Sequence, residues 1–421
     1  MNLQKILSRF QKLHPKEIDL SLDRIKLICE KLGNPQDKIK AISVVGTNGK
    51  QSTINAIFSI LKEAKMKCNV YSSPHIQKIN ERFIFNNQIL EDEKLAFLFE
   101  EVEKVNDNQS ITFFEMLTAC YFYKAAEYPE NLNLIEAGLF HRFDATNILK
   151  KNLASVITSI SKDHTDWLPK NEQTIEKIVY EKTSSLLKSN IIVSRQNLEM
   201  TKETIKKTIL NNSSNKLFFN EDFSYLNGEN GFFYYEDKFG GLKLPLPNIL
   251  GQFQLENIST AIATLRLLDI GIKNDDIKNG ITKIESIARL QKISSGKLKE
   301  LLKNNQLLLD GSHNEDGARV LNEYLQSINC NKHVIIGMMA NKDHEKYISY
   351  FKDISSLTTI DIPGQPNSIS GKDLKEKFKC IPNVQYKESI EQAIRSIPLK
   401  ENDLVIITGS LYLAGEMLNL N

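Results

Sequence analysis

The chain has few cysteines and almost no net charge, and each of these absences excludes a class of protein. Its 421 residues include 54 Lys and Arg and 52 Asp and Glu, a formal net charge of +2. So small a charge gives no global field for holding nucleic acid or an anionic membrane. An odd, scattered set of cysteines without a CxxC pair predicts reduced thiols rather than disulfides or structural zinc. The cysteines are Cys29, Cys68, Cys120, Cys330 and Cys380.

Long apolar runs are also missing. The apolar runs that occur, such as residues 307–309, are no longer than a strand, and polar residues interrupt every longer segment. A membrane-spanning helix needs about 20 predominantly apolar residues, so we expect none. Charges also interrupt residues 1–10, where a secretory signal would need an apolar stretch. We therefore expect a cytoplasmic protein that binds neither membrane nor nucleic acid.

The pattern that is present indicates an α/β fold in two domains. At 48.0 kDa the chain exceeds the usual size of one compact domain. Short β-branched runs alternate with amphipathic segments, which is typical of a parallel sheet covered by helices. We expect strands at residues 42–45, 69–71, 132–135, 155–159 and 191–194, and helices at 53–64 and 113–126.

Residues 211–244 have a different character, because Asn-Gly and Gly-Gly pairs and four consecutive aromatic residues predict hairpins on the rim of the sheet. A helix at 256–268 and a polar linker at 286–299 follow. A second series of strands is expected at 307–309, 334–336, 357–360 and 404–407. We predict a larger domain with a mostly parallel sheet at residues 1–288 and a smaller Rossmann-like α/β domain at 289–421.

A glycine-rich turn joins the first strand to its helix, and residues 46–52 read Gly-Thr-Asn-Gly-Lys-Gln-Ser. Small residues let backbone N–H groups approach a polyphosphate, Lys50 adds a mobile charge, and the Ser52 hydroxyl can bind Mg²⁺. The strict Walker pattern is not met, because Val44 occupies its first glycine position and the hydroxyl follows Lys50 by two residues. Taken alone, the motif also fits an ordinary turn.

Three polar side chains follow other expected strands. Ser73, Glu136 and His164 each lie past the carboxyl end of a strand, as Lys50 does. In open α/β sheets these ends form one crevice. A hydroxyl and a carboxylate beside a phosphate loop suit Mg²⁺, whereas imidazole is an unusual ligand for so hard a cation. A solvated Glu136 and a packed His164 stay open as alternatives for each residue taken singly.

Further segments occur in a fixed order, and together with GTNGKxS they resemble the folylpolyglutamate synthase/dihydrofolate synthase branch of the Mur ligase superfamily. The resemblance covers nearly the whole chain and is highly specific. The segments are SSPH at 72–75, TFFE at 112–115, EAGL at 136–139, RFDATN at 142–147, DHT at 163–165, EK at 181–182, GQFQ at 251–254, RL at 289–290, DGSHN at 310–314 and TGSLY at 408–412.

This resemblance implies an ATP-dependent ligase that joins L-glutamate to dihydropteroate, to reduced folates, or to both, through an acyl phosphate. It implies that residues 1–288 form a P-loop ATPase domain that binds ATP and the pterin, and that residues 289–421 form the glutamate-ligase domain. It implies a monomer with small-molecule substrates, Mg²⁺ at two sites and a carbamylated Lys182, and it allows a monovalent cation. Magnesium would be held by Ser52, Ser73, Glu136 and His164. From the residues alone, Lys182 is one lysine in a charged helix.

The other site residues follow from the resemblance in the same way. Lys50, Lys182 and His313 would be catalytic, with His313 orienting or deprotonating the incoming amine. Glutamate would be bound by His313 and Ser410. ATP would be bound by Asn48, Gly49, Lys50, Gln51, Ser52, Asn257, Arg289 and Asp310. The pterin would be bound by Asp23, Arg24, Thr112, Phe113, Phe114, Glu115, Arg142 and Asp144.

Two departures from the family pattern affect these expectations. Gln51 stands where the family usually has glycine, and Phe140-His141 replaces a Gly-Gly pair beside the expected pterin loop. We expect the second change to influence substrate choice. Two alternatives stay open: a related ligase for another carboxylate, such as a cell-wall precursor, and a nucleotide-binding switch without catalysis. The TFFE and DATN segments favour the folate branch, and Glu136, His164 and Lys182 argue against the switch.

Overall fold

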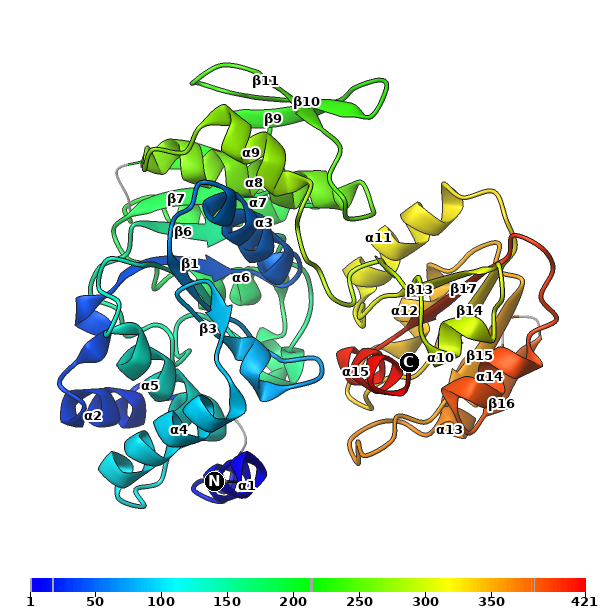
Figure 1. Cartoon of the computed structure of the whole chain (residues 1–421), viewed down its shortest axis with the longest axis horizontal. Helices are drawn as coiled ribbons and strands as arrows, with labels where there is room; N and C mark the ends of the chain where they lie inside the picture. Colours follow the sequence, from blue (N-terminus) through cyan, green and yellow to red (C-terminus); the bar gives the residue numbers. More distant parts are fainter. Residues whose placement is uncertain (1, 17–18, 213–214, 380, 382) are drawn as a thin grey trace. The chain divides into compact units, whose positions relative to one another are not determined.

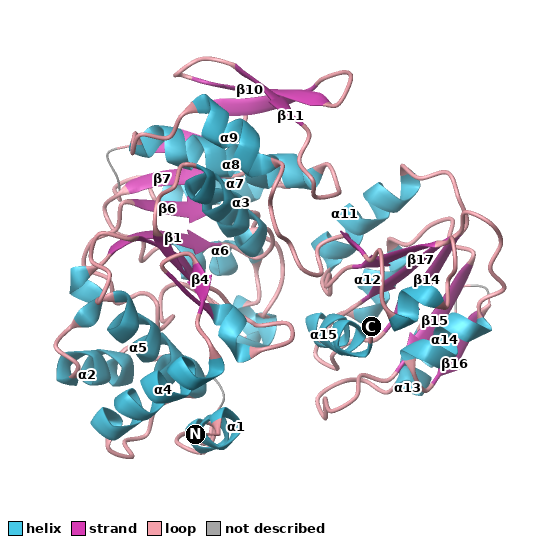
Figure 2. Cartoon of the chain, in the orientation of Figure 1, coloured by secondary structure: helices cyan, strands magenta, loops and turns pink. Residues whose placement is uncertain are grey.

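The computed structural model describes residues 2–16, 19–212, 215–379, 381 and 383–421. It divides into two compact units. The first comprises Met1–Leu246 with Glu256–Ile284, and the second comprises Pro247–Leu255 with Glu285–Asn421. Each unit contains a sheet covered by helices (Figure 2), so the predicted α/β class is confirmed.

The sheet of the first unit has eight strands in the order β4-β3-β2-β5-β1-β6-β7-β8, and neighbours from β2 to β8 are parallel. Strand β1 lies between β5 and β6, so that Val44 pairs with Glu136 and Val45 with Ile157. The phosphate loop therefore leaves the middle of the sheet. The bounds are β1 Lys40–Val45, β2 Cys68–Tyr71, β3 Phe83–Phe85, β4 Gln88–Ile89, β5 Leu132–Glu136, β6 Ala154–Ile157, β7 Asn190–Val193 and β8 Lys216–Phe218.

Both faces of this sheet are buried, which explains its nearly continuous apolar strands. Val45 and Ile157 pack in one cluster with Ile178 and Ile205 from two helices. Val44 points to the opposite face, because successive side chains alternate, and it is also fully buried. In Figure 1, α3, α8 and α9 lie together next to β1, β6 and β7. The helices are α1 Leu3–Phe10, α2 Asp23–Lys31, α3 Lys50–Glu63, α4 Asp92–Asn106, α5 Phe113–Ala125, α6 Ile175–Thr183, α7 Glu199–Thr208, α8 Phe253–Leu268 and α9 Asn274–Ile281.

The segment expected to form hairpins gives a separate antiparallel sheet of β9 Phe223–Asn227, β10 Phe232–Asp237 and β11 Leu242–Pro245. One of its faces is buried through Phe233 and Tyr235, whereas Tyr234 between them is 45% exposed. The segment differs from the prediction at its start. There β8 joins the main sheet in parallel, because its apolar residues pair with those of β7. Residues 213–214 of this segment lie outside the described residues.

The second unit has a six-stranded sheet in the order β12-β13-β17-β14-β15-β16, parallel except for the β12–β13 pair. Strand β12 lies within the predicted polar linker and helix α10 begins in it, because buried Ile293 and Leu298 give that segment an apolar side. The strands are β12 Gln291–Lys292, β13 Gln306–Leu309, β14 Lys332–Ile336, β15 Ser356–Ile360, β16 Val384–Lys387 and β17 Leu404–Thr408. The helices are α10 Lys297–Glu300, α11 Glu315–Gln326, α12 His344–Ser349, α13 Gly371–Lys377, α14 Ile390–Ser396 and α15 Leu411–Leu420.

Two expectations from composition concern the whole chain. Among the described residues, no helix is both long enough and apolar enough to cross a membrane. Cys29, Cys68, Cys120 and Cys330 are free thiols, and Cys380 lies outside the described residues.

Candidate active site

The phosphate loop is shaped by two glycines that no other residue could replace without displacing its neighbours. A Cβ atom on Gly46 would lie 2.0 Å from Thr158 Oγ1. Gly49 has a φ of +87°, and a Cβ atom there would lie 2.4 Å from Asn257 Oδ1. The loop is thus held against the segment after β6 and against α8. Asn257, predicted to bind ATP, lies in contact with the start of α3.

Part of the loop's backbone is already hydrogen-bonded within the protein. The N–H groups of Thr47 and Asn48 donate to Ser159 O at 2.8 and 3.1 Å. The expectation that the loop's N–H groups wrap a phosphate therefore applies to the first turn of α3, whose amides lack intrahelical acceptors and carry the positive end of the helix dipole. Gln51 lies in this turn and is not among the residues with positive φ, so glutamine fits there without backbone strain.

Lys50, Glu136 and Ser73 come from the ends of three neighbouring strands and meet beside this loop. Lys50 Nζ lies 3.9 Å from Glu136 Oε1, with side-chain exposures of 14% and 5%. Glu136 Oε2 accepts a 3.1 Å hydrogen bond from Ser73 N. Lys50 Nζ also donates to Gly46 O at 3.3 Å. A cation and a carboxylate thus lie together in a largely buried place at the carboxyl edge of the sheet.

Lys182 reaches the same place from α6. Its side chain is buried, and Nζ donates to Gly46 O at 2.9 Å and to Leu139 O at 2.7 Å. Burial, and next the charge of Lys50, lower the pKa of Lys182 to about 7, although Asp163 and Asp144 act in the opposite direction. Near neutral pH a large fraction of this amine is therefore unprotonated and nucleophilic.

The residues predicted to hold magnesium lie at or after the carboxyl ends of four neighbouring strands, β2, β5, β1 and β6. Ser52 is buried in the first turn of α3, and His164 follows β6, where its backbone N–H donates to Asp163 Oδ1 at 2.8 Å. Within the described ranges, no three acidic, histidine or cysteine side chains form a group that could hold a metal. Because Mg²⁺ keeps several waters and takes one or two carboxylates plus substrate phosphates, Glu136 beside the phosphate loop fits a site that the nucleotide completes.

The residues predicted to bind the pterin fall into two groups, and the first lies at the start of α5. Arg24 Nε donates to Glu115 Oε2 at 2.9 Å, and Thr112 caps the helix through reciprocal hydrogen bonds with Glu115. Glu115 is buried, and its Oε1 has no hydrogen-bond partner among the described residues. Asp23, by contrast, is exposed. The structure thus assembles Arg24, Thr112 and Glu115 and leaves Asp23 at the surface.

The second group surrounds Gly138. A Cβ atom on Gly138 would lie 3.0 Å from the Phe114 ring and 3.2 Å from Asp144 Oδ2. Asp144 is buried, and its carboxylate accepts hydrogen bonds from the N–H groups of Gly138 and Leu139 and from Thr146. Burial raises the pKa of Asp144, and these hydrogen bonds oppose the rise. Asp144 therefore organises its own loop.

Phe113 and Arg142 are engaged by the protein itself. Phe113 is partly buried and packs against the apolar cluster beneath α5. Arg142 forms two hydrogen bonds with the Glu181 carboxylate, at 2.7 and 2.8 Å, and its guanidinium lies 4.4 Å from the centre of the Phe143 ring. The Arg142 loop is thus anchored to the end of α6, next to Lys182.

In the second unit, Asp310 fixes the segment that carries Arg289. The Asp310 carboxylate accepts hydrogen bonds from Leu290 N and Ser312 N, both at 2.9 Å. The residues on either side of Arg289, Ala288 and Leu290, have φ values of +53° and +50°. Arg289, half-buried, is therefore presented on a tightly constrained turn.

The residues predicted to bind glutamate lie at strand ends of the same unit. His313 follows β13, and its Nδ1 lies 2.9 Å from Gly311 O. Ser410 follows β17 and caps α15 by accepting a hydrogen bond from Tyr412 N at 3.1 Å. Both therefore lie at the carboxyl edge of the second sheet.

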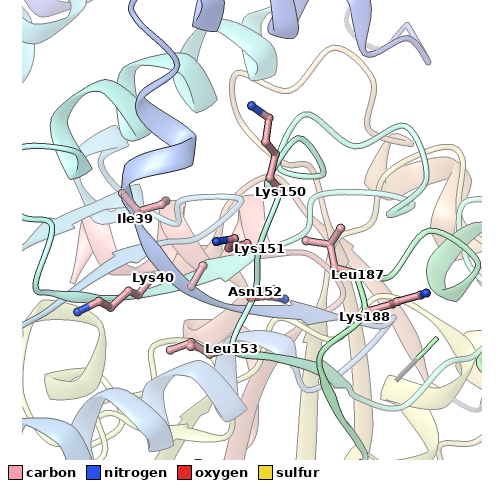
Figure 3. A pocket seen from close by; sticks show the side chains of 9 residues that line it. Ile39, Lys40, Lys150, Lys151, Asn152, Leu153, Leu187 and Lys188 are labelled. Carbon is pink, nitrogen blue, oxygen red and sulfur yellow. The ribbon is translucent and has the colours of Figure 1, made fainter. Parts of the chain in front are cut away.

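A cavity of about 590 Å³ lies elsewhere in the first unit (Figure 3). It opens at the amino ends of β1 and β6, and none of the predicted site residues lines it. Two of its lysines are paired with acids, Lys40 with Glu130 and Lys150 with Asp37. This basic cavity is separate from the candidate active site. It is lined by Ile39, Lys40, Ala41, Lys150, Lys151, Asn152, Leu153, Leu187 and Lys188.

Sequence reasoning missed the residues that hold the phosphate loop from the other side. Ser159 accepts two loop amides, Thr158 lies against Gly46, and Ser161 exchanges hydrogen bonds with Thr47. The rule that singled out Ser73 and Glu136, a polar residue just past a buried strand, also applies to them. For Thr158 and Ser159 the expected strand extends to residue 159, whereas β6 ends at Ile157, which places both residues just past the strand.

Comparisons with known proteins agree with this arrangement. Residues 289–411 match the family model for "Mur ligase, glutamate ligase domain". The chain is 30% identical to the dihydrofolate synthase/folylpolyglutamate synthase of Haemophilus influenzae, over 98% of this chain and 96% of that protein. It is similar to the structure of Escherichia coli FolC in complex with DHPP and ADP, with a TM-score of 0.88, 28% identity and coverage of 100% and 97%. The Yersinia pestis bifunctional enzyme complexed with AMPPNP and Mn ion gives a TM-score of 0.87 at 25% identity, with coverage of 100% and 98%.

Proposed function

The chain belongs to the dihydrofolate synthase/folylpolyglutamate synthase family, and from this membership we infer that it is an ATP-dependent ligase forming carbon–nitrogen bonds. It joins L-glutamate to dihydropteroate, to the γ-carboxyl group of reduced folates, or to both. The observation that carries this conclusion is a similarity running over 98% of the chain at 30% identity. The proposal is supported by the meeting of Lys50, Glu136 and Lys182 at the phosphate loop.

The reaction must activate a carboxylate, because a carboxylate has no adequate leaving group for attack by an amine. Transfer of the γ-phosphoryl group of ATP to the substrate carboxylate gives an acyl phosphate. The neutral amine of glutamate then attacks the acyl carbon, and phosphate leaves. Lys50, held at the loop by its hydrogen bonds to Gly46 O and Thr47 O, would stabilise the charge on the transferring phosphoryl group.

We propose that Ser52, Ser73, Glu136 and His164 hold magnesium. When bound, the metal would neutralise and orient phosphate oxygens. The Yersinia pestis enzyme complexed with AMPPNP and Mn ion supports the use of a nucleotide and a divalent metal in this family. Two magnesium sites and a monovalent cation are part of the same proposal.

Carbamylation of Lys182 is a further part of the proposal. It is supported by the lowered pKa and the burial of this amine, because only the unprotonated amine adds CO2. The modification would place an anionic oxygen donor next to Gly46 of the phosphate loop.

The remaining roles are proposed from the family pattern. ATP would contact Asn48, Gly49, Gln51, Asn257, Arg289 and Asp310. The pterin would contact Asp23, Arg24, Thr112, Phe113, Phe114, Glu115, Arg142 and Asp144, and glutamate would contact His313 and Ser410. We further propose a monomer that acts in the cytoplasm, a reducing compartment in which the four described free cysteines would stay thiols.

The test is ADP release and incorporation of labelled glutamate, with dihydropteroate and tetrahydrofolate compared as acceptors. We expect incorporation with at least one of them, strictly dependent on ATP and a divalent metal. Incorporation with neither acceptor would overturn the substrate class, and glutamate-dependent ADP release with another carboxylate would then identify a related ligase. Enzyme carrying Lys50→Met is the negative control for contaminating activity.

A further inference from the structure

The loop containing Phe140 and His141 is packed directly against Lys182. The N–H groups of His141 and Arg142 donate to Glu181 O at 3.1 and 2.9 Å. Lys182 Nζ donates to Leu139 O at 2.7 Å and lies 5.5 Å from the centre of the Phe140 ring. The Phe140 ring therefore lies beside the Lys182 amine, and the backbone of His141 is bonded to the residue before Lys182.

The His141 ring has a buried nitrogen without a hydrogen-bond partner among the described residues. His141 is 4% exposed, and its Nδ1 is the atom that has no partner within the described part of the chain. A buried polar nitrogen without a partner costs free energy. Burial, and next the charge of Lys182, lower the pKa of His141 to about 4, so the ring is neutral near pH 7 and carries one N–H donor.

The Lys182 amine is buried without a negatively charged group to pair with it in the described ranges. Its side chain is buried without an acidic partner in ion-pair contact among the described residues, and its two hydrogen bonds go to backbone carbonyl groups, Gly46 O and Leu139 O. The Phe140 ring face attracts an ammonium ion weakly, but burial outweighs this attraction, because the pKa falls to about 7. The amine is therefore available to react, and its charged form acts on the His141 ring, because the charge of Lys182 contributes to the lowered pKa of His141.

We propose that His141 is a positioning residue that donates a hydrogen bond from Nδ1 to the carbamate of Lys182 and thereby stabilises this modification. The inference rests on the proposed function for the carbamate itself. For His141 it rests on the unpartnered Nδ1 and on the packing of residues 139–142 against α6. A single contact would satisfy the buried donor and partly neutralise the new anion.

The covalent step balances without a redox partner. The lone pair of the neutral Lys182 amine forms a bond to the carbon of CO2, one C=O π pair moves onto oxygen, and one N–H proton passes to solvent. The product is R–NH–COO⁻, which keeps one N–H group for one of the two carbonyls that the amine contacts. The new carboxylate oxygens are acceptors, and Nδ1–H of His141 is a donor.

The test is ¹³C NMR of the whole chain titrated with ¹³C-labelled bicarbonate. We expect a carbamate resonance in the wild type and none in Lys182→Ala. His141→Leu keeps the apolar volume but removes the donor, so the bicarbonate concentration for half occupancy should rise roughly tenfold or more, the size expected for a hydrogen bond to a charged group. His141→Asn keeps a donor near Nδ1 and should stay within about threefold of the wild type.

The matched control is His344→Leu, which removes a buried histidine from the second unit and should leave carbamate occupancy unchanged. Unchanged occupancy in His141→Leu would overturn the inference, since a buried water at Nδ1 would give that result. If this variant does not fold, the wild-type ¹⁵N resonance of His141 Nδ1 decides, because it must shift on bicarbonate addition. If the enzyme ligates glutamate but shows no carbamate resonance, the inference is wrong and the proposed ligase activity is unaffected. If the carbamate forms but no glutamate is ligated, only the proposed function is overturned.

Discussion

Lys50 and Lys182, 132 positions apart in the sequence, donate hydrogen bonds to the same carbonyl oxygen, that of Gly46, at 3.3 and 2.9 Å. Two amines on one acceptor would repel each other if both were charged. The charge of Lys50 contributes, after burial, to the lowered pKa of Lys182. The pair therefore divides into a cation at the phosphate loop, Lys50, and an amine, Lys182, whose pKa of about 7 leaves a substantial part of it neutral near pH 7.

Replacing Lys50 by methionine removes the cation and keeps most of the side-chain volume. We expect kcat/KM for ATP-dependent ligation to fall about 10²- to 10³-fold, the loss typical when one charge-stabilising donor is removed. The measurement is ADP release at saturating glutamate, with thermal denaturation to verify folding. Lys62→Met, in the exposed last turn of the same helix, should match the wild type, and equal losses in the two variants would contradict a role for Lys50.

Replacing Glu136 by glutamine keeps an acceptor for Ser73 N but removes the negative charge. We expect the Mg²⁺ concentration for half-maximal activity to rise at least about tenfold, because even changes outside the ligand shell reach that size. Chelation should abolish ligation, and added Mg²⁺ should restore it. Glu130→Gln, which alters an exposed carboxylate paired with Lys40, is the control. An unchanged magnesium requirement in Glu136→Gln would remove this residue from the metal site.

Lys182 should make folding stability depend on pH with a defined sign. Its pKa is about 7 in the folded chain against 10.5 for the ordinary side chain, so between these values only the unfolded state binds the proton. Stability therefore rises with pH across this window, by at most about 1.4 kcal/mol per unit from this group. Below pH 7 the penalty of the buried charge is fully present.

The measurement is urea denaturation at pH 7, 8 and 9 in CO2-free buffer. Lys182→Met should lose this slope and should gain most over the wild type at the lowest pH. Lys62→Met, which removes a positive charge at an exposed site, should keep the wild-type slope. A slope that survives in Lys182→Met would mean that another group produces it.

The sequence predicted the architecture well, because the relevant patterns are local. Buried parallel strands give short apolar runs, and those at 132–135, 334–336 and 404–407 correspond to β5, β14 and β17. Polar residues at the ends of such strands share one edge by topology alone. The sequence alone therefore predicts that Lys50, Ser73 and Glu136 lie together.

What the sequence could not predict depends on tertiary packing. Lys182 lies in a helix that also contains Lys177 and Glu181, and nothing local distinguishes it from a solvated lysine. It is buried because the 139–142 loop packs over the end of α6. The same limit applies to residues 286–299, which the sequence predicts to be a polar linker. Only the fold shows that Ile293 and Leu298 of this segment are buried.

The double variant Phe140→Gly with His141→Gly tests substrate choice. Because Phe140 is 2% exposed, its loss alone should destabilise the fold by about 3–5 kcal/mol, seen as a lower melting temperature. We also expect the ratio of kcat/KM for dihydropteroate to that for tetrahydrofolate to change. The ratio is insensitive to the folded fraction, since both substrates meet the same enzyme. An equal fall on both substrates would contradict a role in substrate choice, and would instead be the pattern expected if the pair acts through Lys182, whose chemistry both substrates share.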